Sequence, residues 1–127
     1  MVGTAIKSIL SDVDANLFGL HVPNRRGSQW VIITKIDRQP TQTKGGVSDY
    51  DKYLYQLDCY ARTEADMDTL AASVKSAMDD YSGTVSSTVI DHIFFQGESD
   101  SVEKIEDEGA VENYYRMTQE YDIWIKS

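Results

Sequence analysis

Apolar side chains recur at every second position along four stretches of the chain, which is the spacing of a β-strand with one buried face. The stretches are residues 30–37, 53–61, 88–96 and 114–126. In the second of them one face would carry Tyr53, Tyr55, Leu57, Cys59 and Ala61. We therefore predict four half-buried strands, of which the last is longer than a typical strand.

The apolar spacing changes from two to three and four directly after the strand at 53–61. Thr63 and Asp66 stand where an N-cap and a first-turn acid are expected, and Ser82-Gly83 is typical of a helix C-terminus. The apolar face of this predicted helix consists of Met67, Leu70, Ala71, Val74, Met78 and Tyr81. A shorter stripe near the N-terminus predicts another amphipathic helix, with Ile6, Ile9, Leu10 and Val13.

The predicted order of elements is helix, strand, strand, helix, strand, strand. Strands that flank one helix and are joined by hairpins favour antiparallel pairing. We expect one domain over residues 1–127 with an α+β fold, a two-layer sandwich of a mostly antiparallel four-stranded sheet with two helices on one face. A length of 127 residues with 41% hydrophobic content is enough for one core and too short for two domains.

Two polar segments separate the predicted strands and are expected to be loops. Residues 39–49 contain Pro40 and a Gly-Gly pair, and residues 97–112 contain seven acids and one lysine, a composition expected to be mobile in isolation. Both segments are longer than ordinary turns, so we expect them to contact partner proteins. The candidate contact residues are Lys44, Gly45, Gly46, Glu98, Asp100, Glu103 and Glu106.

Charge and chemistry narrow the function. With 21 acids against 12 bases the formal net charge is −9, which argues against binding to nucleic acid through its phosphates. His21, His92 and the single Cys59 lack partners at metal-ligand or nucleophile spacings, so we expect no catalytic residue, metal or cofactor. One Lys7 and a short apolar stripe give neither a signal peptide nor a membrane span, and the expected compartment is a cytoplasm.

Several aromatic residues fall on the second face of the predicted sheet, opposite the face that the helices would cover. A monomer would expose Tyr60, Tyr114 and Trp124 there. Charged residues on the same face can set the register between neighbouring subunits. The predicted oligomer interface comprises Asp58, Tyr60, Arg62, Tyr114, Arg116, Glu120, Asp122 and Trp124.

Three parts of the sequence resemble the tail completion, or tail terminator, proteins of long-tailed bacteriophages. They are the strand Tyr55-Gln-Leu-Asp-Cys-Tyr-Ala61, the helix at 65–80 with its Leu70-Ala71 pair, and the ending Tyr121-Asp-Ile-Trp-Ile125 after Tyr115-Arg-Met. In that family a similar strand enters a helix, and the chain closes on a long aromatic strand. The resemblance covers residues 50–127 well and the N-terminal half in element order; the acidic segment departs from it.

The resemblance implies a structural virion protein that forms a ring, usually a homohexamer, on the last ring of the tail tube. Such a ring stops tube polymerisation and provides the docking surface for the head. The implied partners are the chain itself, the major tail tube protein and a head-closure or connector protein. The implied location is the head-tail junction of a particle assembled in the host cytoplasm. An acidic lumen would let DNA pass without binding it.

Two other classes stay open at this point. A head-closure or connector protein of the neck would have a similar size and composition. A small-ligand-binding intracellular domain is the other, and it predicts an apolar pocket with perturbed titratable groups, for which the sequence offers no candidate.

Overall fold

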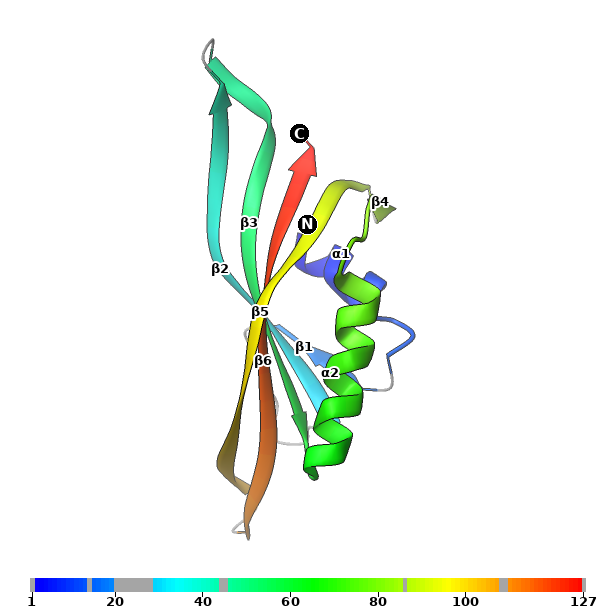
Figure 1. The fold of residues 1–127 in the computed structure, drawn as a ribbon, viewed down its shortest axis with the longest axis vertical. Helices are drawn as coiled ribbons and strands as arrows, with labels where there is room; N and C mark the ends of the chain where they lie inside the picture. The colour runs from blue at the N-terminus through cyan, green and yellow to red at the C-terminus, as the bar shows by residue number, and fades with distance from the viewer. Residues whose placement is uncertain are drawn as a thin grey trace.

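The computed structural model describes the backbone of residues 2–13, 15–19, 29–43, 46–85, 87–107 and 110–126. The chain forms a sheet that curls beside two helices (Figure 1). Along the sequence the elements are α1 (Val2–Ile9), β1 (Asn16–Phe18), β2 (Gln29–Thr43), β3 (Gly46–Ala61), α2 (Glu64–Met78), β4 (Gly83–Val85), β5 (Thr88–Asp107) and β6 (Ala110–Lys126).

The sheet has the strand order β1-β2-β3-β6-β5-β4. It is mixed, because β1 pairs parallel to β2 while the other neighbours pair antiparallel. The four long strands extend past the helices. The β2–β3 hairpin projects at one end of the molecule and the β5–β6 hairpin at the other (Figure 1). The centre of the sheet is therefore covered by helices, and the two hairpin ends are not.

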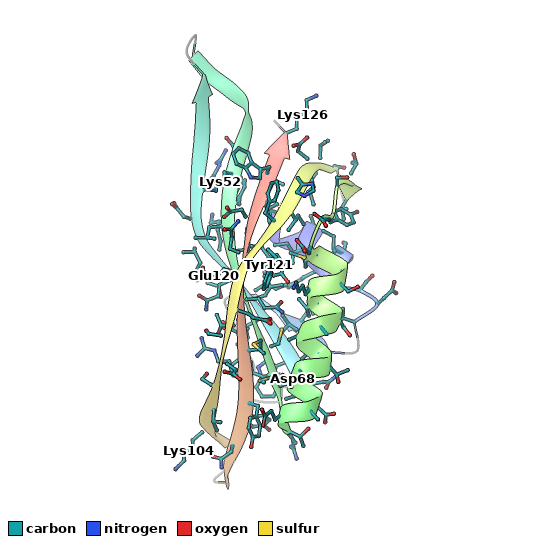
Figure 2. The ribbon with its side chains drawn as sticks, in the orientation of Figure 1. Lys52, Asp68, Lys104, Glu120, Tyr121 and Lys126 are labelled. Carbon is teal, nitrogen blue, oxygen red and sulfur yellow. The ribbon has the colours of Figure 1, made fainter. Side chains whose placement is uncertain are left out.

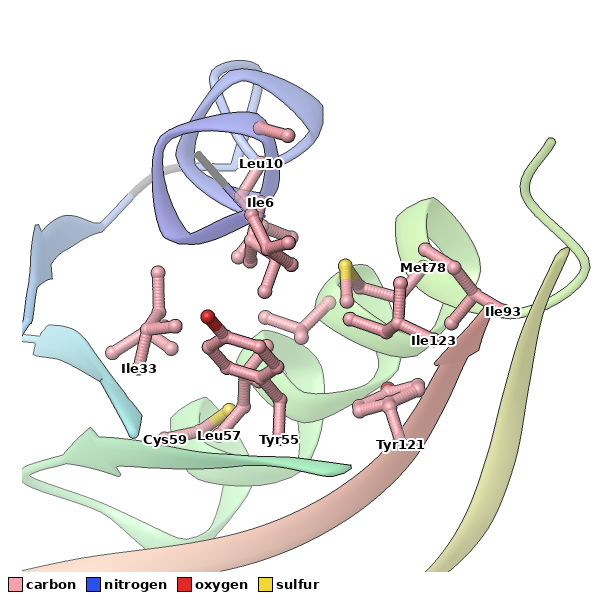
Figure 3. Packing of buried hydrophobic residues seen from close by; sticks show 14 of the residues in the cluster. Ile6, Leu10, Ile33, Tyr55, Leu57, Cys59, Met78, Ile93, Tyr121 and Ile123 are labelled. Carbon is pink, nitrogen blue, oxygen red and sulfur yellow. The ribbon is translucent and has the colours of Figure 1, made fainter. Parts of the chain in front are cut away.

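The main core lies between the helices and the face of the sheet that carries Leu57 and Cys59 of β3 (Figure 3). Five of the six residues predicted for the apolar face of α2 are buried, and Tyr81 is half-buried. From α1, Ile6 and the adjoining Leu10 are fully buried in the same cluster. The predicted N-cap is confirmed, because the Thr63 hydroxyl accepts a hydrogen bond of 3.1 Å from the Asp66 amide.

The predicted end of α2 is wrong by several residues. The helix ends at Met78 with Asp79 as its C-cap, and the left-handed position is Asp80 with φ 63°, before Gly83 is reached. The Asp80 amide donates to the Ile93 carbonyl at 3.0 Å, and the Ile93 amide donates to the Tyr81 carbonyl at 3.1 Å. Backbone bonding to β5 thus replaces helical bonding earlier than the sequence pattern indicates.

The predicted fold class is also wrong. The sheet has six strands, is mixed and strongly curled, and the element order is not α-β-β-α-β-β. The two strands absent from the prediction, β1 and β4, have three residues each, which is too short to show alternation. Because β1 pairs parallel to β2, it also changes the sheet from antiparallel to mixed.

The two polar segments predicted as loops are largely strand. In the β2–β3 hairpin Thr43 pairs with Gly46, and in the β5–β6 hairpin pairing continues from Glu98 with Gln119 to Asp107 with Ala110. No helix covers these ends, so polar residues suit both faces and the apolar alternation disappears while the backbone ladder continues. The prediction of loops there is therefore corrected to two long hairpins.

Candidate interface on the open face of the sheet

The face of the sheet opposite the helices is the candidate functional surface, and we call it the open face. Even-numbered residues of β3, and of β6 as far as Trp124, point to it, and the register places Asp58 beside Thr118 and Tyr60 beside Arg116. Figure 2 shows Lys52 and Glu120 directed away from the helices and Tyr121 directed toward them. All eight residues of the predicted interface lie on strands β3 and β6 or, for Arg62, directly after β3.

An aromatic cluster occupies one part of the open face. Trp30 of β2 stacks on Tyr60 with ring centroids 4.9 Å apart, and it meets Tyr114 edge-on at 4.7 Å. Exposed fractions of 1% for Trp30 and 6% for each tyrosine show that the three rings form a second small core, against which Ile32 packs. The expectation that Tyr60 and Tyr114 would be exposed in the monomer is therefore wrong.

Trp30 was not among the residues predicted for this interface, although it pairs with the predicted residue Tyr60. Antiparallel pairing places Trp30 directly beside Tyr60, and cross-strand aromatic pairs of this kind stabilise sheets. The alternation of apolar residues along 30–37 indicated which residues share a face with Trp30, but it did not indicate that Tyr60 lies beside Trp30 on the adjacent strand.

A buried carboxylate lies next to the aromatic cluster. Asp58, with 5% of its surface exposed, accepts hydrogen bonds from Arg116 Nε at 3.1 Å, Thr118 Oγ1 at 2.7 Å and Gln56 Nε2 at 3.0 Å. The Arg116 guanidinium also lies 5.9 Å from the centre of the Tyr60 ring. Several donors and one guanidinium satisfy this carboxylate, as a buried charge requires, and the pair ties β3 to β6.

Arg62 completes this part of the predicted interface, because its guanidinium lies 5.8 Å from the centre of the Tyr114 ring. Cations over aromatic faces at such distances are attracted by the ring quadrupole. Five of the eight predicted residues, Asp58, Tyr60, Arg62, Tyr114 and Arg116, are thus brought together, and they bind largely to one another.

The other three predicted residues lie farther along β6. Lys52 Nζ is 3.5 Å from Asp122 Oδ2 and 5.9 Å from the centre of the Trp124 ring. Glu120 is exposed, and Phe94 of β5, which pairs with Asp122, has 46% of its surface exposed. This half of the open face has exposed charged and apolar side chains, whereas the aromatic half is packed within the subunit.

The predicted contact residues of the polar segments are divided between the two hairpins. Gly46 begins β3, and Lys44 and Gly45 lie outside the described residues. Glu98, Asp100, Glu103 and Glu106 all lie on β5, where they pair with residues of β6. The Glu98 carboxylate accepts a hydrogen bond of 3.0 Å from Gln119 Nε2, so its position is fixed by the core.

A polar network that the sequence did not reveal connects this position to α2. Gln119 is fully buried; its amide also donates to the Ala71 carbonyl at 3.0 Å and its carbonyl accepts from the Tyr121 hydroxyl at 2.8 Å. Burial raises the pKa of Tyr121 above its usual value and raises the pKa of the neighbouring Cys59 thiol to about 12. Both groups are therefore neutral near pH 7, and a neutral thiol is a poor nucleophile.

The described residues form neither a metal site nor a helix that could span a membrane. Among them no group of three or more His, Cys, Asp or Glu is placed to hold a metal ion. His92 Nε2 lies 3.2 Å from Asp80 Oδ1, and His21 falls outside the described residues. None of the described helices is both long and apolar enough to span a membrane.

Comparisons with known proteins give one family match and two solved structures with a similar fold. The family model described as tail completion protein gp17 matches residues 3–126. A chain of the virion of a native gene transfer agent (GTA) particle has a similar structure, with a TM-score of 0.62 and 12% identity over 96% of this chain and 84% of that chain. A second solved chain gives a TM-score of 0.55 and 9% identity over 96% and 92%. No curated protein matches the sequence.

Proposed function

The chain belongs to the family of tail completion protein gp17, and from that premise we propose that it forms a ring that caps the tail tube of a phage-type particle. Membership of this family makes it a structural protein of a phage tail and places it in the virion. The observation that carries the proposal is that the family match extends over nearly the whole chain. The proposed ring is a homohexamer that stops tube polymerisation and receives the head.

The shape of the molecule supports a role between two partners. A tail cap contacts the last tube ring on one side and a head-side protein on the other, so it needs two separated contact regions. The two long hairpins project at opposite ends of the covered core (Figure 1). Within the proposed ring each end would contact a neighbouring copy as well as one of the two partners, the major tail tube protein on one side and a head-closure or connector protein on the other.

The open face supports contacts between neighbouring subunits. Its aromatic half is packed within the subunit, which fixes the backbone of β3 and β6 before association and lowers the ordering cost of binding. The other half, with the exposed Glu120 and Phe94 and the half-buried Asp122 and Trp124, is the part that we propose a neighbour covers. Aromatic anchors surrounded by charges are typical of protein interfaces.

The charge of the chain fits a ring with DNA in its lumen. A formal charge of −9 per subunit would repel the phosphates of passing DNA wherever acidic side chains line the channel. The proposed contact with DNA is therefore passage without specific binding.

Tail length provides the test of this function. Particles assembled without the protein should carry tubes that are longer than normal and lack heads, because nothing ends polymerisation, and resupplying the wild-type chain should restore uniform tails with heads. Electron micrographs of tail-length distributions measure this. Headless tails of normal length would instead identify a head-closure or connector protein. Normal tails joined to heads would contradict both roles.

A further inference from the structure

A concave site with a positive rim lies on the helix side of the sheet, close to the β2–β3 hairpin. Its volume is about 750 Å³, and it lies among α1, β2, β3, the start of β5 and the end of β6. Val89 and Ile125 contribute apolar surface, while Lys35, Arg38 and Lys126 contribute three positive charges. Every described residue that lines it is either neutral or basic, although the chain as a whole is strongly acidic.

Two of these three cations have no ion-pair partner among the residues whose side chains the structure describes. Arg38 forms an ion pair of 2.6 Å with Asp51. Lys35 and Lys126 are exposed, and neither forms an ion pair with any residue that the structure describes. The site therefore offers unpaired positive charge beside exposed apolar surface, since Val89 has 41% of its surface exposed.

The opposite end of the molecule carries complementary groups. Residues 97–112 contain seven acids and one lysine, a net charge of −6. On β5, Asp100 and Val102 are two positions apart and thus on one face, and both are exposed, Val102 to 59%. The β5–β6 hairpin consequently presents an apolar side chain next to an acid on a regular, paired backbone.

We propose that the β5–β6 hairpin of one copy docks into the concave site of the next copy. This inference rests on the proposed ring and names a further contact between its subunits, besides the one proposed for the open face. Val102 would pack against Val89 and Ile125, and the acids of the hairpin, Asp100 among them, would face the positive rim. The site lies close to the β2–β3 hairpin, and the β5–β6 hairpin projects at the opposite end of the molecule (Figure 1). A subunit therefore cannot fill its own site, and the occupant is a second copy.

The geometry of such a contact fits assembly of a closed ring. It joins two different surfaces, and a head-to-tail contact of this kind produces a ring when the rotation between subunits closes. Opposite charges on the two surfaces also accelerate encounter and fix the register. Salt screens exposed charges, so the association should weaken as ionic strength rises.

Charge reversal tests the contact in the purified chain. Lys35→Glu should raise the dissociation constant between copies by about tenfold or more, because it places a repulsive charge opposite the acidic hairpin. Lys7→Glu makes the same change at an exposed position of α1 outside the site and should leave association within about twofold of wild type. Sedimentation equilibrium measures both constants, and circular dichroism checks that both variants fold.

The reverse substitution supplies a rescue. Asp100→Lys alone should weaken association in the same way, and a chain with both Lys35→Glu and Asp100→Lys should recover much of the loss, since each copy then offers the exchanged charges to its neighbour. Additive losses in the double variant would overturn this charge pairing.

Crosslinking locates the contact in assembled particles. A Lys35→Cys/Val102→Cys chain treated with a short bismaleimide should yield a ladder of covalent oligomers, and the native Cys59 should not react because it is fully buried. If the Lys35→Glu chain still forms oligomers and the Lys35→Cys/Val102→Cys chain gives no ladder, the hairpin contact is overturned while the proposed ring stays intact. A chain that stays monomeric and gives no ladder would overturn it as well, and the tail-length test would then decide the proposed function separately.

Discussion

The two faces of the sheet are buried by different means. On the covered face, aliphatic side chains of β3 and β6 such as Leu57 and Ile123 pack against α1 and α2. On the open face, three aromatic rings of β2, β3 and β6 pack on one another, and the Asp58–Arg116 pair lies beside them. The comparison shows that a sheet face without helices can bury large side chains through its own cross-strand neighbours.

This difference has a functional consequence. The helices close the centre of the covered face to other molecules, whereas half of the open face remains exposed around Glu120 and Phe94. Substitutions in the covered face should therefore affect folding, and those in the exposed half of the open face should affect assembly.

The largest effect is expected where a charge enters the covered face. Val74 is fully buried between α2 and the sheet, so Val74→Asp should lower the free energy of unfolding by about 4–5 kcal/mol or prevent folding. Ser73→Asp, one residue earlier on the exposed side of α2, should change it by less than about 0.5 kcal/mol. Urea denaturation of both variants measures the difference. Similar stability of the two variants would contradict the assignment of the covered face.

A somewhat smaller loss is expected from the aromatic cluster. Trp30→Ala should cost about 3 kcal/mol, because it leaves Tyr60 and Tyr114 without their shared partner. Ile36→Ala, at a half-exposed position on the same strand, serves as the control and should cost about 1 kcal/mol or less. The same denaturation experiment applies. Equal losses would mean that the open face has no core of its own.

The buried ion pair should contribute less than the rings. Asp58→Ala removes the carboxylate that accepts from Arg116, Thr118 and Gln56 and should cost about 2 kcal/mol. Asp122→Ala removes the ion-pair partner of Lys52. Asp122 is more exposed than Asp58, so this change should cost at most about 1 kcal/mol. Thermal unfolding at matched ionic strength compares them, and a larger loss for Asp122→Ala would reverse the expected order.

The smallest effect concerns pH and distinguishes the covered face from the open one. The Cys59 thiol has a folded pKa of about 12 because of burial, above its ordinary value of 9.0. Because the pKa is raised in the folded state, the contribution of the thiol to stability is fully present below pH 9 and is lost as the pH rises toward 12. The free energy of unfolding should thus fall by about 1 kcal/mol between pH 9 and 10 from this group. Cys59→Ala should show a shallower decline in denaturation series across that range.

The sequence predicted those parts of the fold whose side chains alternate over many residues. The four long strands and the buried face of α2 follow from such alternation, and Thr63 marked the start of the helix. The three-residue strands β1 and β4 were missed because they are too short to show a period. The hairpin ends were missed because pairing there depends on backbone hydrogen bonds and leaves no apolar pattern.

For the candidate site, the sequence predicted which side of the sheet each residue lies on, but not which residues it contacts there. Alternation placed Asp58, Tyr60 and Arg116 on one side of the sheet, as the structure has them. Whether a side chain on that side is exposed or buried depends on cross-strand register, which brings Trp30 to Tyr60 and closes the cluster. Gln119 was missed for a related reason, since a polar residue on a covered face is recognised only once its partners Ala71 and Tyr121 are in place.

Electron cryomicroscopy of the assembled particle tests the central claim most directly, because it locates this chain in the virion. We expect a ring of copies of this curled sheet between the last ring of the tail tube and the head-side proteins, with subunits related by a single rotation. A density for this fold at the distal tip of the tail, or as isolated subunits along the tube, would contradict it.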